Sequence, residues 1–196
     1  MILGITGSSG AGKSTVCEIL EKKYHAKIIN ADKIAKKLSQ KGTEYLAKIV
    51  QNFGIDILLA NGELNRRKLA DIIYQDSQKR ELLNKCTFQY IKKEIEKQIQ
   101  EAQEELIAID APLLFEAKLE EFCNFTIAVI AKNKEIQLQR IMKRDGIEEA
   151  HAKQRIAAQP ENEYYISKCD YQIINDNKLE DMEAQIDRTI KKILKI

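Results

Sequence analysis

The stretch Gly7-Ser8-Ser9-Gly10-Ala11-Gly12-Lys13-Ser14 decides the fold, because it fits the phosphate-loop pattern G-x-x-x-x-G-K-[S/T] at every defined position. It follows the apolar run Ile2–Thr6 and precedes a segment whose apolar residues recur at helical spacing, which is the setting that the pattern requires. Glycines let the backbone turn its N–H groups toward an anion, and the N-terminus of the next helix adds a partial positive charge. A plain Gly/Ser-rich turn is the alternative, but both flanks favour a nucleoside triphosphate site.

The chemistry of this loop assigns roles to its last residues. Lys13 supplies a full positive charge to the β- and γ-phosphates, and the Ser14 hydroxyl can bind Mg²⁺. The residues that we expect to hold the triphosphate are Gly10, Ala11, Gly12, Lys13, Ser14 and Thr15.

Short apolar runs alternate with segments of helical spacing along the chain. Continuous apolar runs suit a parallel sheet that helices cover on both faces, so we predict a doubly wound α/β fold with five strands. The predicted strands are Ile2–Thr6, Lys27–Ala31, Leu106–Ile109, Phe125–Ala131 and Tyr171–Ile174. We expect a single domain, with a core of residues 1–32, 106–131 and 161–196, a helical acceptor-binding insertion over 33–105, and a helical lid over 132–160.

Composition excludes several classes of protein. The 196 residues include 32 Lys and Arg against 30 Asp and Glu, and this balance argues against a partner such as nucleic acid or an anionic membrane. The longest dense apolar stretch is much shorter than the roughly 20 residues of a membrane-spanning helix, and the N-terminus does not resemble a signal peptide. The four cysteines form no C-x-x-C pair, so we expect reduced cysteines, no zinc site and a cytoplasmic protein. We expect a monomer, and the sequence leaves an oligomer open.

Two aspartates follow predicted strands, Asp32 after the second strand and Asp110 after the third. In a parallel sheet both carboxylates would project toward the phosphate loop. One can orient and partly deprotonate an acceptor hydroxyl, which favours Asp32, and the other can hold Mg²⁺ through water, which favours Asp110. The alternative is that each aspartate caps the helix after it.

Arginines cluster in the predicted lid and in the predicted insertion. Arg140 and Arg144 lie four residues apart on a predicted helix, and Arg155 follows, so these guanidinium groups could stabilise a phosphoryl group in transfer. The alternative is a solvated helix face whose partners are nearby acidic residues. In the insertion, Arg66 and Arg67 could bind a phosphate of the acceptor or begin a solvated helix.

Taken together, these segments resemble the dephospho-coenzyme A kinase family over nearly the whole chain. The resemblance rests on the loop, on Ile29-Asn30-Ala31-Asp32, on Asn61-Gly62-Glu63-Leu64-Asn65-Arg66, and above all on Asp110-Ala111-Pro112-Leu113-Leu114-Phe115-Glu116. Arg140, Arg144, Arg155, Gln159, Asp170 and Asn175 also fall at the family's spacing. The chain departs from the family's usual residues in three places: Cys86-Thr87 stands for His-Pro, Tyr165 for a basic residue and Asn177 for glycine.

The resemblance implies a P-loop kinase-like fold and the transfer of the γ-phosphoryl group of ATP to the ribose 3′-hydroxyl of dephospho-coenzyme A, with Mg²⁺. It implies that Asp32 is the catalytic base, with Lys13 and Arg140 as the other catalytic residues. It further implies that Arg144 and Asn175 bind ATP. The residues implied to bind the acceptor are Thr6, Asp32, Arg66, Leu113 and Phe115.

Three alternatives to this function stay open. A different small-molecule kinase of the same fold would use another acceptor. A nucleotide-dependent switch or assembly ATPase would use water as the nucleophile, and the N-K-x-D segment usual in GTPases of this fold is absent from the sequence. The third alternative is a non-catalytic ATP-binding relative, against which the intact Lys13, Ser14 and Asp32 argue.

Overall fold

The structure, a computed structural model, describes residues 1–176 and 178–195, so the departure at Asn177 lies outside the described residues. The chain divides into two compact units, which are residues 1–29 with 102–196, and residues 30–101. The second unit begins and ends within a few residues of the predicted insertion over 33–105. That this segment binds the acceptor stays a prediction.

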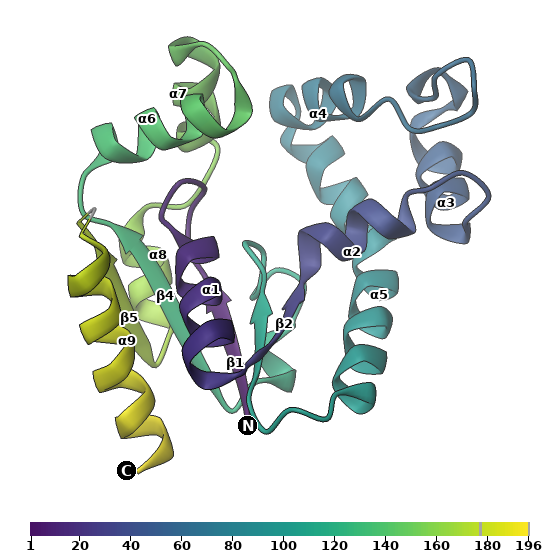
Figure 1. Ribbon diagram of the computed structural model, residues 1–196. Helices are drawn as coiled ribbons and strands as arrows, with labels where there is room; N and C mark the ends of the chain where they lie inside the picture. Colours follow the sequence, from purple (N-terminus) through teal and green to yellow (C-terminus); the bar gives the residue numbers. More distant parts are fainter. Residues whose placement is uncertain (177, 196) are drawn as a thin grey trace. The chain divides into compact units, whose positions relative to one another are not determined.

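A single five-stranded parallel sheet forms the centre of the first unit (Figure 1). The strands lie in the order β2-β3-β1-β4-β5, and β1 pairs in parallel with both β3 and β4. The predicted α/β sheet is therefore confirmed, with small shifts at the strand ends: β2 stops before Ala31, and β3 extends to Asp110. The bounds are β1 Ile2–Thr6, β2 Lys27–Asn30, β3 Ile107–Asp110, β4 Phe125–Ala131 and β5 Tyr171–Asn175.

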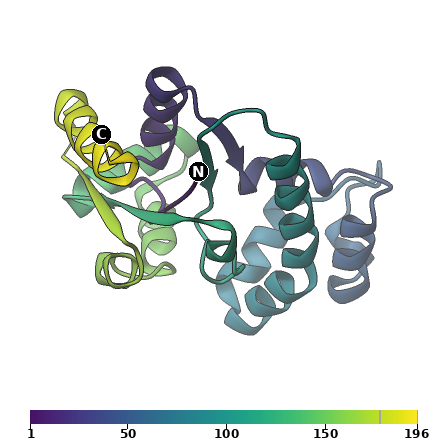
Figure 2. The ribbon, with the colours of Figure 1, turned by 90° about the horizontal axis from the view of Figure 1, so that it is seen from below.

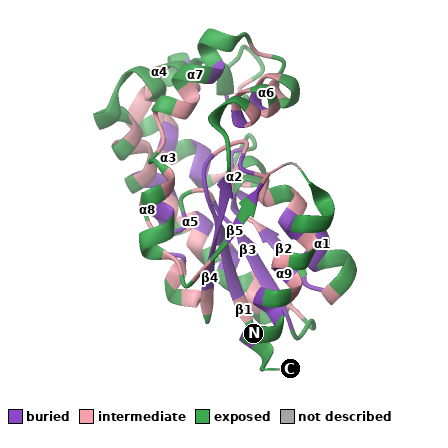
Figure 3. Cartoon of the chain, turned by 90° about the vertical axis from the view of Figure 1, so that its left-hand side faces the viewer, coloured by how far each residue is buried: buried purple, intermediate pink, exposed green. Residues whose placement is uncertain are grey.

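Helices cover both faces of this sheet, which explains why its strands are continuous apolar runs. Helices α1 (Lys13–Tyr24) and α9 (Leu179–Leu194) pack on one face, and α8 (Asn162–Lys168) packs on the other (Figure 2). Strand β4 shows the alternation: Ile127 and Val129 belong to the core under α1 and α9, while Ala128 and Ile130 pack against Tyr165. Figure 3 shows the strands as the buried centre of this unit.

The charged segment after β4 folds as the sequence predicts, into two helices, α6 (Lys134–Asp145) and α7 (Glu149–Ala157). The Asn133 side chain caps α6 by accepting a hydrogen bond from the N–H of Glu135, and Gly146 ends the helix in the left-handed region at φ 62°. A short 3-10 helix, η2 (Glu120–Phe122), precedes β4 in the same unit.

The second unit is mainly helical and has one antiparallel bridge, between Leu58 and Leu64. Its elements are α2 (Ala31–Leu38), α3 (Glu44–Phe53), the 3-10 helix η1 (Ile55–Ile57), α4 (Arg66–Gln75) and α5 (Ser77–Glu101). Helices α2, α3 and α4 each pack against the long α5. The Thr43 hydroxyl caps α3 by accepting a hydrogen bond from the N–H of Leu46, and Gly54 ends the helix. In residues 1–176 and 178–195, no helix is long and apolar enough to cross a membrane.

Candidate active site

The phosphate loop connects β1 to α1, and its turn depends on glycine. Gly12 has a φ of 105°, and a Cβ at this position would lie 2.0 Å from Nδ2 of Asn175. A side chain would therefore suffer backbone strain and also displace Asn175. Gly12 thus serves two purposes: it turns the chain into α1, and it admits a side chain from the end of β5.

Three successive carbonyl groups of the loop are held by side chains from elsewhere in the first unit. The oxygen of Ser9 accepts a hydrogen bond from Gln137 at 2.6 Å. The oxygen of Gly10 accepts one from Arg140 at 3.3 Å, and the oxygen of Ala11 accepts one from Asn175 at 2.8 Å. These carbonyl groups belong to three consecutive peptide planes, so the side chains together fix the course of the loop.

The direction of these carbonyl groups determines the direction of the N–H groups. In a planar trans peptide the C=O of one residue and the N–H of the next point in opposite directions. The N–H groups of Gly10 and Gly12 therefore point away from the side chains that hold the carbonyls of Ser9 and Ala11. The N–H of Ala11 closes a turn onto the oxygen of Ser8 at 3.2 Å. The loop thus presents N–H donors on one side, as an anion site requires.

Lys13 begins α1 and folds its amine back over the loop. Its Nζ donates hydrogen bonds to the oxygens of Gly7 at 2.7 Å and Ser8 at 3.2 Å. The amine therefore lies at the loop, and charge-assisted hydrogen bonds to a phosphate would be stronger than those to neutral carbonyls. Ser14 is exposed in the first turn of α1, and Thr15 follows it there.

Asp110 lies at the carboxyl end of β3, beside the end of β1, where Ile5 is its register partner. Only 6% of Asp110 is exposed. Burial raises the pKa of the Cys17 thiol, the charge of Asp110 raises it further and that of Lys13 lowers it, so both charged groups lie near this part of α1. Residues 112–118 form turns after β3, so the alternative role of Asp110 as a helix cap is wrong.

The acceptor residues predicted in the first unit lie on or near the turns after β3. Thr6 is fully buried, and its hydroxyl donates a hydrogen bond to the oxygen of Pro112 at 3.3 Å, so Thr6 supports these turns. Leu113 is exposed, whereas the Phe115 ring packs edge-on against Tyr164 at 6.5 Å between ring centroids. Tyr165, which stands where the family often has a basic residue, is buried against β4 and supplies no cation.

The arginines of α6 reach the loop. Arg140 donates to the side-chain oxygen of Asn175 at 2.9 Å as well as to Gly10, and burial lowers the pKa of Arg140. Arg144 donates to the hydroxyl of Ser9 at 3.0 Å and to the carboxylate of Asp145 at 2.7 Å. Both guanidinium groups are thus placed at the loop, where a role in phosphoryl transfer would require them.

Asp145 joins an arginine of α6 to an arginine of α7. Its carboxylate accepts hydrogen bonds from Arg144 in α6 and from Arg155 in α7. The hydrogen bond from Arg144 lowers the pKa of Asp145, and the charges of both arginines lower it further. This carboxylate therefore connects α6 and α7.

The second unit holds the two predicted residues Asp32 and Arg66. The cap of α2 is Asn30, whose side chain accepts a hydrogen bond from the N–H of Lys33. The alternative that Asp32 caps this helix is therefore wrong, and Asp32 lies exposed in the first turn. Arg66 donates to the hydroxyl of Ser39 at 2.6 Å, which ties the start of α4 to the end of α2.

Cys86 and Thr87, which replace the family's usual His-Pro, lie buried in the middle of α5. The Thr87 hydroxyl donates to the oxygen of Leu83 at 2.6 Å, one turn earlier in the same helix. Burial raises the pKa of the Tyr45 phenol, and a hydrogen bond with Thr87 lowers it. The charge of Arg66 also lowers this pKa and that of Asp32 raises it, so both charged groups lie near the phenol.

Sequence reasoning missed Gln137 as a residue of the site. Its side chain is buried and contacts the loop, but Gln137 carries no charge and belongs to none of the motifs in the sequence. The available signal was spacing, because Gln137 precedes Arg140 by three residues and so lies on the same face of α6. Gln159, one turn after Arg155, accepts a hydrogen bond from the N–H of Ser9 at 2.6 Å.

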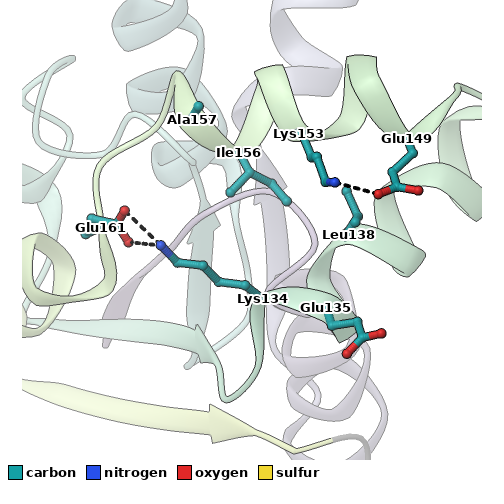
Figure 4. A pocket seen from close by; sticks show the side chains of 8 residues that line it. All are labelled: Lys134, Glu135, Leu138, Glu149, Lys153, Ile156, Ala157 and Glu161. Atoms are coloured by element: carbon teal, nitrogen blue, oxygen red, sulfur yellow. Dashed lines mark hydrogen bonds and ion pairs between the residues drawn. The ribbon is translucent and has the colours of Figure 1, made fainter.

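A separate pocket of about 500 Å³ lies between α6 and α7 (Figure 4). Two ion pairs border it, Lys134 with Glu161 at 2.8 Å and Lys153 with Glu149 at 2.6 Å. No residue of the phosphate loop lines this pocket. It is therefore distinct from the predicted nucleotide site.

Comparison with known proteins agrees with the geometry of the loop. A family profile described as dephospho-CoA kinase matches residues 1–181. A dephospho-CoA kinase of Enterococcus faecalis is 38% identical over 192 residues, which cover 97% of this chain and 96% of that protein. The solved dephospho-CoA kinase from Campylobacter jejuni is 29% identical and superposes with a TM-score of 0.67. The match covers 99% of this chain and 97% of the solved chain. The crystal structure of TT1252 from Thermus thermophilus is 25% identical in sequence and superposes with a TM-score of 0.79. The match covers 99% of this chain and 96% of the TT1252 chain. The chain belongs to the dephospho-CoA kinase family.

Proposed function

We propose that this protein transfers the γ-phosphoryl group of ATP to the ribose 3′-hydroxyl of dephospho-coenzyme A, giving ADP and coenzyme A in the last step of coenzyme A biosynthesis. The observation that carries the proposal is an intact phosphate loop, with its carbonyl groups held outward, in a chain that matches the dephospho-CoA kinase profile over residues 1–181. In the reaction the acceptor oxygen bonds to the γ-phosphorus as the bond from that phosphorus to the β,γ-bridging oxygen breaks.

The donor would bind to the N–H groups of the loop and to Lys13. Lys13 would exchange its bonds to the oxygens of Gly7 and Ser8 for bonds to phosphate oxygens. Arg140 and Arg144 would neutralise charge on the phosphoryl group during transfer, because both already reach the loop. Fixed donors of this kind need little reorganisation when charge moves in the transition state.

The residues at the end of the loop suit Mg²⁺, which prefers oxygen ligands and keeps part of its water shell. Ser14 would contribute its exposed hydroxyl, and Asp110 would contribute its buried carboxylate through water. Bound there, Mg²⁺ would neutralise negative charge on the β- and γ-phosphate oxygens. Removal of divalent ions with EDTA should abolish turnover, and added Mg²⁺ should restore it.

Asp32 would orient the acceptor hydroxyl and take its proton. Its carboxylate is exposed in the first turn of α2, two residues after β2 ends, and Asn30 performs the capping role that would otherwise occupy it. Replacing Asp32 by Asn should lower kcat about 10²-fold or more while ATP still binds. Full turnover by this variant would remove Asp32 from the mechanism.

A screen of acceptors distinguishes this function from its alternatives. ADP release is measured with Mg-ATP and dephospho-coenzyme A, with a nucleoside, with a nucleoside monophosphate and without acceptor. We expect release that depends on dephospho-coenzyme A. Faster release with another acceptor would indicate a different kinase, and equal release without acceptor would indicate a nucleotide-dependent switch.

We further propose that the enzyme works in the cytoplasm as a monomer. All four cysteines are free thiols, as a reducing compartment would keep them. Gel filtration with light scattering should give a mass near 22.5 kDa, and twice that mass would contradict the monomer.

A further inference from the structure

A buried glutamine contacts the phosphate loop with both of its donor hydrogens. Gln137 lies in α6 and is 5% exposed. Its Nε2 donates to the oxygen of Ser9 at 2.6 Å and to the hydroxyl of Ser8 at 2.9 Å. A carboxamide has two donor hydrogens, so the loop takes the full donor capacity of this side chain.

Close packing fixes Gln137 relative to the loop. A Cβ on Gly10 would lie 2.8 Å from the backbone oxygen of Gln137, 3.0 Å from its Cγ and 3.0 Å from Cγ1 of Ile141. No layer of water fits between surfaces this close, and Ile141 is fully buried beside the contact. Helix α6 and the loop therefore meet directly, and Gln137 has little freedom to turn elsewhere.

The orientation of the peptide between Ser9 and Gly10 is only weakly fixed by the backbone, because the residue after the peptide bond is glycine. Reversing it changes the φ of Gly10, and glycine tolerates positive and negative φ about equally, so the backbone opposes this reversal only weakly. In the structure Gly10 has a φ of 78°, and the oxygen of Ser9 points to Gln137. The reversed peptide would present a carbonyl oxygen where a phosphate needs an N–H donor.

We propose that Gln137 is a positioning residue for the phosphoryl donor. It holds the oxygen of Ser9, directs the N–H of Gly10 to the opposite side of the loop, and ties the loop to the helix that carries Arg140. The proposal deepens the proposed function, on which it rests for the identity of the donor. Gln137 acts through the loop and needs no contact with the acceptor.

The test compares two glutamines of the same helix. Gln137→Met keeps the length of the side chain and removes its donors, and Gln139→Met is the matched control because Gln139 is exposed on α6. We expect Gln137→Met to raise the Kd of Mg-ATP and the KM for ATP about tenfold, which corresponds to about one buried hydrogen bond. The KM for dephospho-coenzyme A should stay within twofold, and Gln139→Met should leave both values unchanged. Unchanged ATP affinity in a folded Gln137→Met enzyme would overturn the proposal.

A second variant tests the same point without an apolar side chain. Gln137→Glu keeps shape and polarity but places an acceptor against the oxygen of Ser9, so ATP affinity should fall at least as far as in Gln137→Met. A Gln137→Glu enzyme that binds ATP like the wild type would also overturn the proposal. ATP binding is measured by calorimetry without acceptor. Weakened ATP binding would therefore support the positioning role of Gln137 even if dephospho-coenzyme A were not the substrate. Normal ATP binding with normal turnover would refute that role and leave the proposed reaction intact.

Discussion

The side chain of Asn175 donates a hydrogen bond to the carbonyl oxygen of Ala11 at 2.8 Å, although 164 positions separate the two residues. The same carboxamide accepts a hydrogen bond from Arg140 with its oxygen. Asn175 therefore connects the end of β5, the phosphate loop and α6. This arrangement makes the loop dependent on residues far from it in sequence.

Loss of Asn175 should affect stability and ATP binding together. Asn175→Ala leaves the buried oxygen of Ala11 without this donor, so we expect the free energy of unfolding to fall by about 1–3 kcal/mol. The Kd of Mg-ATP should rise as well, because the Ala11–Gly12 peptide is released. Urea unfolding and calorimetry measure the two effects. Gln172→Ala, at an exposed position of the same strand, is the control and should change neither quantity. An Asn175→Ala enzyme with normal ATP affinity would contradict the proposed role of this side chain.

Lys13 should matter for phosphate binding far more than for folding. Lys13→Ala removes a charge that the β- and γ-phosphates would meet, so we expect weaker ATP binding and slower transfer together. Thermal unfolding should change little, because the hydrogen bonds of the amine to the oxygens of Gly7 and Ser8 are only partly buried. Lys22→Ala, on an exposed position of α1, should behave like the wild type. Unchanged kinetics for Lys13→Ala would contradict the assignment of the loop.

Alanine at position 10 should destabilise the protein more than alanine at position 146, although both glycines have a positive φ. Gly10→Ala combines a left-handed φ with a Cβ that would lie 2.8 Å from the backbone of Gln137, so we expect a loss of about 2–4 kcal/mol in unfolding free energy. Gly146 has a φ of 62° and open space around it, so Gly146→Ala should cost about 1 kcal/mol. Denaturant titrations compare the two. Equal losses of unfolding free energy in the two variants would contradict the close contact between α6 and the loop.

The carboxylate of Asp145 should make the connection between α6 and α7 sensitive to acid. Its pKa is lowered in the folded protein, so its stabilising contribution is complete above the unfolded value of about 4 and disappears as the pH falls through the lowered value. Asp145→Asn should cost about 1 kcal/mol at pH 7, because the ion pairs are partly exposed. The difference between the two proteins should shrink as the pH falls below the unfolded value of about 4, as measured by thermal unfolding over pH 2–7. A constant difference across this range would show that the charge of Asp145 is not the cause.

Local patterns in the sequence were sufficient to predict the sheet and the loop. The phosphate-loop motif and the apolar runs depend on residues within a few positions of one another, and β1 and β4 have the predicted bounds. The predicted bounds were wrong at the ends of elements, where a single capping residue sets the boundary. Asn30 caps α2, so the helix begins at Ala31. Asp32 therefore lies in a helix and not at the end of a strand.

The contacts that hold the loop could not be predicted in the same way. Gln137, Arg140 and Asn175 meet three adjacent carbonyls only because α6 and β5 fold onto the loop. The spacing of the arginines predicts Arg140, and the resemblance to a family predicts Asn175; both contact the backbone of the loop in this structure. Gln137 carries no charge and fits no motif, so only its burial and its partners identify it.

Product analysis tests the proposed reaction most directly. The purified protein is incubated with Mg-ATP and dephospho-coenzyme A, and the acceptor is then analysed by mass spectrometry and phosphorus NMR. The expected result is a gain of one phosphoryl group on the ribose 3′-oxygen, formed in equal amount to ADP and absent with Lys13→Ala. ATP consumption that leaves dephospho-coenzyme A unchanged, or a phosphoryl group at another position, would contradict the reaction.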